Sequence, residues 1–259
     1  MGIRQLFHPS VIVRDASEWI EAKVDPLFHG PTYQLIAAEA KLQPEDDLLD
    51  VACGAGNFLA YHAPHVQQVA GLDISDLRVR MARRRLADRI AAGTARIVAG
   101  DAGTLPWPDG TFSTVTCMAS LELFTNPQAA LNEMRRVLRP GGRVALTMGA
   151  KVSPKMARKC EKLGWSVWTE TDVQRMMSEA GFAGVSISYG RWDGNSRLLG
   201  ALIRFMAGTD EGRFVHATKP GSHYVDDEQV MRAVARGLAT TPLSASSTFW
   251  PGCGNGCTT

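Results

Sequence analysis

Several absences narrow what this 259-residue chain can be. It has only five cysteines, and Cys53, Cys117 and Cys160 are dispersed rather than spaced as a disulfide framework, which argues against a disulfide-stapled secreted domain. No apolar run approaches the ~20 residues that cross a bilayer. The N-terminus lacks the apolar core and cleavage site of a signal peptide. We therefore expect a cytoplasmic protein with no membrane partner.

The chain also lacks an excess of charge of one sign. With 28 Lys and Arg against 26 Asp and Glu, its net charge is +2, so nothing in the balance requires a polyanionic partner. The strongly basic run RMARRRL, residues 80–86, has no interleaved aromatic residues. A solvated helix face explains that run better than a nucleic-acid surface, and we expect no nucleic acid among the partners.

Two nucleotide-binding motifs are missing, and their absence narrows the class of ligand that residues 48–60, LLDVACGAGNFLA, could bind. No P-loop string occurs, and the dinucleotide fingerprint fails because its third glycine position holds Leu59. The stretch does contain an apolar run ending in Asp50, followed by a turn of small residues that lets a ligand approach bare backbone. The pattern predicts a nucleotide-type site at the tip of the first strand of an open α/β sheet, for a ligand other than NAD or FAD.

A second acid, Asp73, ends another apolar run, VAGLD. A carboxylate at this place can accept hydrogen bonds from both hydroxyls of a ribose. Asp50, in turn, suits a ligand that is cationic near the turn. S-adenosylmethionine (SAM) has a ribose, an adenine, a sulfonium and an α-ammonium group and lacks phosphates, so it fits both acids and both missing motifs.

Four motifs, in order and at fitting spacing, resemble those of class I SAM-dependent methyltransferases, nearest the branch of the ubiquinone/menaquinone biosynthesis methyltransferases. They are LLDVACGAG (48–56), GLDIS (71–75), GDAGTLPWPDGTFS (100–113) and MASLELFTNPQAALNEMRRVLRPGGRVALTM (118–148). A single glycine turn is a weak signal, whereas four motifs in register are specific. The resemblance covers about residues 30–190 and implies SAM as cofactor and S-adenosylhomocysteine (SAH) as product.

The resemblance assigns cofactor contacts residue by residue. The small-residue turn lies under the amino-acid part of SAM, Asp73 takes the ribose hydroxyls, and Ile74 packs on the adenine. Asp101 accepts from the adenine amino group, although taken alone it would be interpreted as a turn acid. The full predicted cofactor set is Asp50, Ala52, Cys53, Gly54, Gly56, Asp73, Ile74, Asp101, Ala102, Met118 and Ala119, of which the last two border the sulfonium.

Some positions depart from the family pattern. Ala52 replaces the first glycine of the turn, and Cys53 is expected to be a small buried side chain rather than a reactive thiol. Arg78 stands where the family usually has an apolar residue, and we expect it to point to solvent. Glu122 follows the fourth strand, where the family often has histidines. It is the predicted catalytic residue, as a base or an acceptor-orienting group, with an exposed helix-start acid as the alternative.

Three aromatic or imidazole side chains are candidates for the acceptor side of the site. Tyr33 and His29, ahead of the first strand, are predicted to form part of a lid over the cofactor. Trp165 is predicted to line the acceptor pocket, with packing over the sheet edge as the alternative. No His and carboxylate pair has ligand spacing near the motif loops, so no metal is expected.

Alternating strand and helix patterns predict the fold. We expect an α/β, Rossmann-like doubly wound sheet of seven strands, mostly parallel, closed by a C-terminal antiparallel hairpin of residues 185–189 and 198–205. Three regions are predicted: an N-terminal lid or helical segment (1–30), the methyltransferase domain (31–207) and a C-terminal extension (208–259). The extension is expected to be flexible, with an end rich in Ser, Thr and Cys.

The predicted reaction is transfer of the SAM methyl group to an O, N or C atom of a small-molecule acceptor by in-line displacement, by a monomer or homodimer. Two alternatives stay open. The tail ATTPLSASSTFWPGCGNGCTT (239–259) resembles a ribosomal-peptide precursor core, which would make the enzyme act on, or be fused to, a peptide substrate. A SAM-binding regulator without turnover would keep the cofactor turn and lack the acceptor pocket.

Overall fold

The computed structural model describes residues 30–149, 158, 160, 162, 165–191 and 211–221, all within the first of the two units, 1–222 and 223–259, into which the chain divides. Its strands are β1 (Asp47–Val51), β2 (Gln68–Asp73), β3 (Ala95–Ala99), β4 (Phe112–Met118), β5 (Leu138–Gly149), β6 (Ala183–Arg191) and β7 (Glu211–Thr218). Its α-helices are α2 (Gly30–Glu39), α3 (Asn57–His62), α4 (Asp76–Arg85), α5 (Ala87–Ala91), α6 (Pro127–Val137) and α8 (Glu170–Glu179), with 3-10 turns η2 (Ala63–His65) and η3 (Leu121–Leu123).

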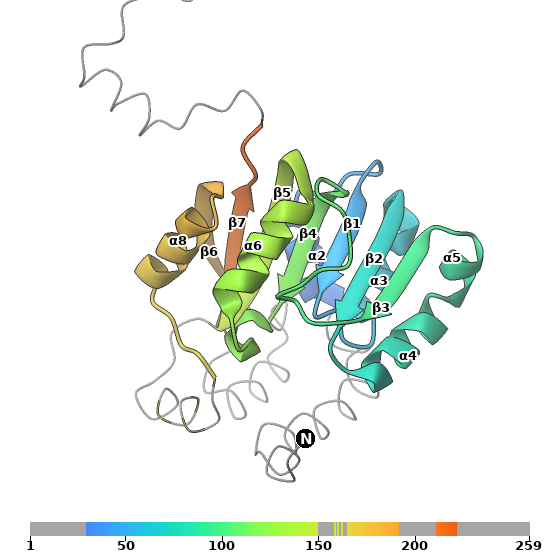
Figure 1. The fold of residues 1–259 in the computed structure, drawn as a ribbon, viewed down its shortest axis with the longest axis horizontal. Helices are drawn as coiled ribbons and strands as arrows, with labels where there is room; N and C mark the ends of the chain where they lie inside the picture. The colour runs from blue at the N-terminus through green and yellow to red at the C-terminus, as the bar shows by residue number, and fades with distance from the viewer. Residues whose placement is uncertain are drawn as a thin grey trace, which may run out of the picture. The chain divides into compact units, whose positions relative to one another are not determined.

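In this part of the chain the strands form one sheet in the order β3-β2-β1-β4-β5-β7-β6 (Figure 1). Strands β1 to β5 pair in parallel, and β7 is antiparallel to both β5 and β6. In Figure 1 the arrow of β7 therefore points up while that of β2 points down. The predicted sheet, mostly parallel with an antiparallel C-terminal pair, is confirmed.

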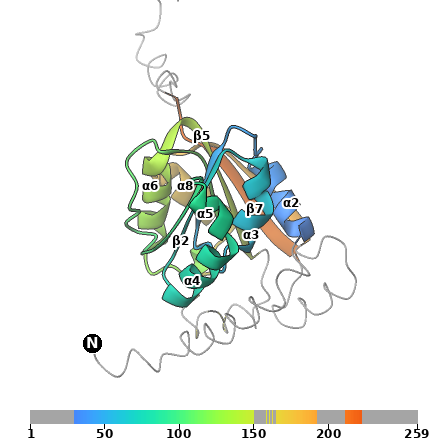
Figure 2. The ribbon, with the colours of Figure 1, turned by 90° about the vertical axis from the view of Figure 1, so that its right-hand side faces the viewer.

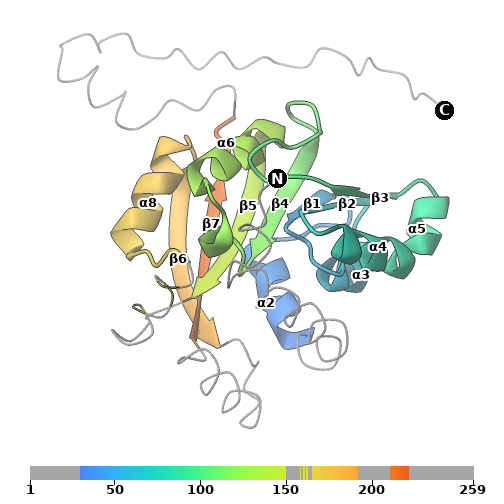
Figure 3. The same ribbon diagram turned by 60° about the horizontal axis from the view of Figure 1, so that its bottom comes forward.

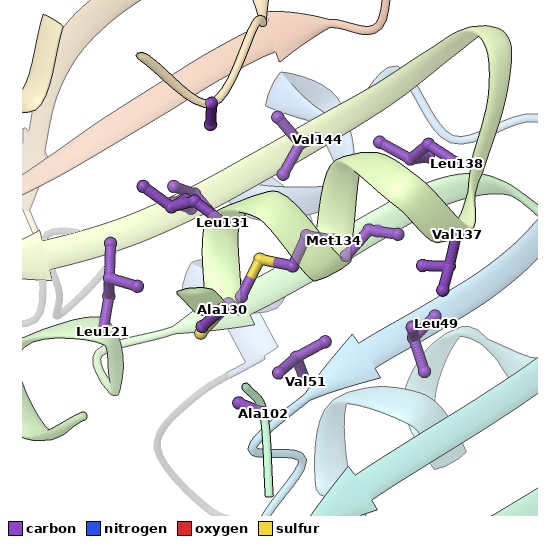
Figure 4. Packing of buried hydrophobic residues seen from close by; sticks show 14 of the residues in the cluster. Leu49, Val51, Ala102, Leu121, Ala130, Leu131, Met134, Val137, Leu138 and Val144 are labelled. Atoms are coloured by element: carbon purple, nitrogen blue, oxygen red, sulfur yellow. The ribbon is translucent and has the colours of Figure 1, made fainter. Parts of the chain in front are cut away.

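Helices cover both faces of the sheet, as its buried strands require. Figure 2 shows α6 and α8 on one side and α2 and α3 on the other. The larger core cluster lies under α6 and α8, where Met134, Leu131 and Ala130 of α6 face strand residues such as Leu49 and Val51 (Figure 4). The smaller cluster joins α2, α3 and α4 to the opposite face.

Local sequence explains where the helices begin. The Thr169 side chain and the Asp172 carboxylate form a reciprocal capping box at the start of α8. Asn126 caps α6 by accepting from the Ala129 amide, with Pro127 in the first turn. These capping residues are readable in the sequence, so the starts of both helices can be located from local signals.

The closing strand differs from the prediction. Residues 211–218 form β7, which pairs with both β5 and β6, whereas the predicted strand 198–205 lies outside the described residues. The domain boundary predicted at residue 207 is therefore too early, because it omits β7. Arg213 and His216 are 4% and 9% exposed within β7, and these buried polar residues hide a strand that an apolar pattern would have revealed. Figure 3 shows β7 between β5 and β6.

A buried ion pair and its hydrogen bonds hold the amino ends of the central strands together. The Arg143 guanidinium donates to both oxygens of Asp46 at 2.6 Å and to the Thr114 hydroxyl at 2.8 Å. Ser113 donates to the same carboxylate at 2.6 Å. Asp46, only 3% exposed, is thus a paired and hydrogen-bonded buried ion, the condition under which buried charge is tolerated.

Candidate cofactor and active site

The strand order reverses between β1 and β4, since the chain builds β1, β2 and β3 outward and then returns to place β4 on the other side of β1. Open α/β sheets bind ligands outside the carboxyl ends of their strands at such a switch point. Asp50, Asp73 and Met118 lie at or beside the carboxyl ends of β1, β2 and β4. Three of the predicted site residues are therefore brought to one edge of the sheet.

The turn after β1 has a backbone that few residues adopt. Ala52, Gly54 and Gly56 have φ angles of +60°, +55° and +75°. A Cβ atom on Gly56 would lie 2.8 Å from the Cβ of Ala82 in α4, so glycine is required for close packing as well as for conformation. The Cys53 amide donates to the Leu72 carbonyl at 3.0 Å, which fixes the turn against β2.

Asp73 organises this edge from within. It is 2% exposed, and its two oxygens accept from the Gly54 amide at 2.8 Å and the Ser75 amide at 2.9 Å. The carboxylate therefore joins the turn after β1 to the start of α4. Because a carboxylate has about four acceptor positions, these two bonds leave capacity for the hydroxyls of a ribose.

Asp50 is the second buried acid, 1% exposed. One oxygen accepts from the Thr116 hydroxyl at 2.8 Å, and the other has no hydrogen-bond partner among the described residues. Burial raises the pKa of Asp50 to about 7, the Thr116 hydrogen bond opposes this, and the nearby Asp73 charge adds to it. Neither acid forms an ion pair within the described ranges.

These observations test whether SAM fits the site. An unpaired buried carboxyl oxygen and a second buried acid make the edge electrostatically negative, which suits a cationic ligand and disfavours phosphates. The turn between them is free of large side chains. The residues present therefore fit the amino-acid and sulfonium part of SAM.

The adenine side is partly assembled. Ile74, directly after β2, is 68% exposed, an unusual exposure for a large apolar side chain, and it is available to cover a ring. Asp101 is exposed, and one of its oxygens accepts from the Gly103 amide at 2.7 Å, so it does form the local turn that its residue type alone predicts. Ala102 is 7% exposed and packs in the larger core cluster.

Arg136 fixes the loop that follows Asp101, a role that sequence reasoning missed. Its guanidinium donates to the carbonyls of Leu105 at 2.9 Å and Trp107 at 2.8 Å and pairs with Glu133. Glu133 accepts in turn from the Leu105 amide at 2.7 Å, and its hydrogen bond with Arg136 lowers the pKa of Glu133. A charged residue on an amphipathic helix gives no sequence signal for such a long-range contact.

Met118 and Ala119 lie where β4 ends. Met118 is half-buried against the smaller core cluster. Ala119 has a φ of +45°, and its amide donates to the carbonyl of Thr147 at 2.9 Å and to its hydroxyl at 3.1 Å. The chain is therefore held to β5 at the point where it leaves the sheet.

Glu122 lies in η3, just after this exit, and is half-buried. Its charge contributes to raising the pKa of the Cys117 thiol, after the larger effect of burial, so its carboxylate is near the end of β4. Its carbonyl accepts from the Ser166 amide at 2.9 Å, which places the segment of Trp165 beside η3. The structure thus brings the predicted catalytic residue and Trp165 into one neighbourhood.

Two other predictions fare differently. Tyr33 is 8% exposed, its ring packs edge-on against Phe58 at 5.7 Å, and it belongs to the smaller core cluster, so the predicted lid position is not supported. The reason is that α2 turns Tyr33 inward against α3. His29 lies outside the described residues.

Arg78 is half-buried, and its charge acts on the Cys53 thiol, so the expectation that it points to solvent is wrong. Burial raises the pKa of the Cys53 and Cys117 thiols well above the usual range, and the Asp50 charge adds to it. Cys53 is therefore a protonated, buried packing residue within the turn. Among the described residues no group of three His, Cys, Asp or Glu side chains is placed to hold a metal ion. None of the helices described has the length and apolar character needed to cross a bilayer.

The sheet order and the acidic, glycine-containing switch-point loop define a class I methyltransferase fold. Residues 49–146 match the family described as Methyltransferase domain, so this segment is a methyltransferase domain. Over 115 residues the chain is 38% identical to the ubiquinone/menaquinone biosynthesis C-methyltransferase UbiE of Pseudomonas putida, a match that covers 43% of this chain and 45% of that protein. The chain thus spans about half the length of the curated relatives it matches.

Two solved structures share the fold. Phosphoethanolamine N-methyltransferase 2 of Haemonchus contortus in complex with SAM has a TM-score of 0.65 at 16% identity, covering 85% of this chain and 60% of that one. The cyclase SpnF has a TM-score of 0.56 at 23% identity, covering 74% and 81%. A methyltransferase and a cyclase on one architecture show that the fold leaves the chemistry to be argued from the site.

Proposed function

We propose that this protein transfers the methyl group of SAM to a small hydroxylated aromatic acceptor of the quinol type, at a ring carbon. The observation that carries the methyl-donor half is the pair of buried acids, Asp50 and Asp73, around a turn of small residues at the switch point. The acceptor half is supported by the activity for which the UbiE relative is named, C-methylation in ubiquinone and menaquinone biosynthesis; that relative is 38% identical over the matched segment.

Each part of the cofactor has a candidate partner. The turn from Ala52 to Gly56 would lie under the amino-acid part, with Asp50 as the nearest counter-charge for its ammonium group. Asp73 would accept from the ribose hydroxyls through the lone pairs that its two amide bonds leave. The exposed Ile74 would cover one face of the adenine, and Asp101 would accept from its amino group.

When bound, SAM supplies an electrophilic methyl group that a nucleophilic carbon of the acceptor displaces in line. The chain's own contribution is mainly alignment, because holding two reactants in register removes much of the entropic barrier. Ala119, tied to Thr147 by two hydrogen bonds, and Met118 fix the floor between cofactor and acceptor. A rigid floor keeps the acceptor atom on the line of transfer.

Glu122 is the proposed base. A ring carbon becomes nucleophilic when the neighbouring hydroxyl loses its proton, and Glu122, an ionisable group just past the end of β4, is the acceptor of that proton in this proposal. General bases in such positions contribute roughly 100-fold to 10,000-fold in rate. Replacement by Gln would keep the shape and remove the basicity.

The test uses the full chain, methyl-labelled SAM and a reduced short-chain naphthoquinone that lacks the ring methyl group. We expect labelled product from the wild-type protein, at least 100-fold slower turnover for Glu122→Gln, and unchanged SAM affinity in that variant by calorimetry. The matched control is Glu179→Gln, an exposed acid at the end of α8.

Two results would contradict the proposal in different ways. No SAM binding by the wild-type protein would remove the methyl-donor half. SAM binding without label in the quinol, but with label in another small molecule from a cell extract, would retain the methyltransferase and replace the acceptor.

A further inference from the structure

Arg213 is a buried cation that the methyl-donor site does not use. It is 4% exposed and lies in β7, where it pairs with Met148 of β5 on one side and with Tyr189 of β6 on the other. The alternate β7 residues Val215 and Ala217 belong to the larger core cluster. Because side chains alternate along a strand, Arg213 points to the same face as these residues, the face covered by α6 and α8.

The guanidinium is only partly satisfied. Its Nη1 donates to the Trp168 carbonyl at 3.0 Å and approaches the Met148 sulfur at 4.0 Å. Its Nε has no hydrogen-bond partner, and no carboxylate forms an ion pair with it, among the residues that the structure describes. A buried charge without a counter-charge costs several kcal/mol, so an anion from outside the described chain is the expected partner.

The strand register places Arg213 beside the reaction edge. Met118 of β4 pairs with Thr147 of β5, and Thr147 pairs with Phe214 of β7. Arg213 is one residue beyond that row, toward the carboxyl ends of the parallel strands. With strands about 4.8 Å apart, Arg213 and Met118 are separated by two strand spacings, about 10 Å. This is a distance between backbones: the Met118 side chain packs on the opposite face, against the smaller core cluster. Leu121 of η3, three residues past Met118, packs on the same face as Arg213, so an acceptor beside η3 lies on the side of the guanidinium.

The neighbours of Arg213 are apolar or already engaged. Trp168 packs against the larger core cluster, to which Leu121 belongs. The Tyr189 hydroxyl donates to Glu170, and this hydrogen bond raises the pKa of Tyr189. The charge of Arg213 and a hydrogen bond with its side chain oppose that rise, so the Tyr189 hydroxyl is also a neighbour of the guanidinium. Glu170 reaches this group through Tyr189 and makes no direct ion pair with Arg213. Among the described residues the buried cation is therefore without a carboxylate in direct contact.

We infer that Arg213 is the specificity residue for an acidic acceptor: it binds a carboxylate or phosphate group carried on an aromatic body that lies beside η3. This inference rests on the proposed methyltransferase function and narrows its substrate class. Arginine suits the task because its planar edge binds carboxylate or phosphate in two parallel hydrogen bonds. With Nη1 held by the Trp168 carbonyl, Nε is the donor that has no partner among the described residues.

The experiment titrates full-length protein, saturated with SAH, with benzoate, phenyl phosphate and the neutral analogue benzamide, by calorimetry. SAH binding is measured first, so that its failure is seen separately as a failure of the proposed function. We expect one of the two anions to bind at least tenfold more tightly than benzamide. Arg213→Gln should abolish that preference, Arg213→Lys should retain part of it, and Arg175→Gln on exposed α8 should leave it unchanged.

Equal affinity for benzoate, phenyl phosphate and benzamide in the wild-type protein overturns the inference. A full anion preference in Arg213→Gln with intact SAH binding overturns it too. If Arg213→Gln does not fold, the charge-preserving Arg213→Lys decides: its anion affinity should fall severalfold while its benzamide affinity stays the same. The tighter anion of the two identifies the acidic group as carboxylate or phosphate.

Discussion

The buried acids at the two ends of the parallel strands differ in whether they have a counter-charge. At the amino end, Asp46 is 3% exposed and is held by Arg143, Ser113 and the Gln43 amide. At the carboxyl end, Asp50 is 1% exposed and has one hydroxyl partner, Thr116. Only four positions in sequence separate the two acids.

The difference separates stability from function. At the amino end, Asp46 has its counter-charge and its hydrogen bonds within the protein, and these contacts hold the strands together. At the carboxyl end, burying Asp50 without a cation costs free energy of folding, and a cationic ligand can offset that cost. Arg213 lies at the same end, and an anionic ligand would offset the cost of burying its charge in the same way. Active sites are where such unpaired groups collect, because ligand binding supplies the missing partner.

The largest expected effect is at the amino end. Arg143→Met leaves Asp46 buried without its cation, and we expect a loss of roughly 3 kcal/mol in the free energy of unfolding, measured with urea. SAM affinity of the folded fraction should not change. Arg139→Met is the matched control, since its pair with Asp47 is half-exposed and should contribute less than about 1 kcal/mol. Equal losses in the two variants would contradict the comparison.

At the carboxyl end the effect should fall on binding. Asp73→Asn removes the charge and one of the acceptors for the Gly54 and Ser75 amides. Hydrogen bonds to charged groups contribute about 1.5–3 kcal/mol, so we expect SAM affinity to fall roughly 100-fold in calorimetry. Asp88→Asn on the exposed surface of α5 is the control. Near-normal SAM affinity in Asp73→Asn would remove the ribose assignment.

Asp50 predicts a pH dependence. With its pKa raised to about 7, the carboxyl is mostly neutral below pH 7 and charged above it. SAM affinity should therefore rise by up to about tenfold per pH unit below pH 7 and level off above it, because the charged form attracts the cation. Asp50→Asn should flatten this profile. A profile that is flat in the wild-type protein would show that Asp50 does not sense the cofactor.

The same shift has a consequence for the ligand-free protein. The pKa of Asp50 in the folded state is above its unfolded value of 3.8, so the unfolded chain loses the proton first as pH rises. The stabilising contribution of Asp50 is complete below pH 4 and is lost as pH rises to about 7. Added SAM should offset that loss, which thermal unfolding at pH 5 and pH 8 with and without SAM can measure.

The smallest expected effect is a shift in the pH profile of SAM affinity, which tests the role of Asp50 further. Thr116→Val removes the hydrogen bond that opposes the raised pKa of Asp50. Since one such bond is worth about 1 kcal/mol, the midpoint of the pH profile of SAM affinity should move upward by less than about one unit. Thr114→Val is a poor control because Arg143 uses that hydroxyl, so Thr111→Val on the surface is preferred. A midpoint that moves downward would contradict the role of Thr116.

Much of the fold was predictable because its signals are local. Residues 68–73 and 95–99 form β2 and β3, and both ranges can be read from the sequence because each is a short, mainly apolar run bounded by turn residues. The turn at Ala52 to Gly56 was identifiable because small residues there are a backbone requirement. The cofactor and catalytic assignments remain predictions, although the structure does gather the acids and Glu122 at one edge of the sheet.

The failures share a physical cause. The closing strand was misplaced and Arg213 was overlooked, because a charged residue in a buried strand contradicts the pattern from which strands are predicted. Tyr33 was taken for a lid residue, but α2 packs it against Phe58 of α3. In each case the environment is made by residues far away in the chain.

The sequence by itself determined the order of strands and helices as far as β6, the left-handed turn after β1 and the class of domain, since periodicity, capping and glycine requirements act over a few residues. Only the tertiary structure decided which charges are neutralised. Asp46 and Asp50 look alike in sequence, and Arg143 and Arg213 do too. Which acid finds an arginine depends on strand register across the sheet, and burial then turns an unpaired acid into a site with a pKa of about 7.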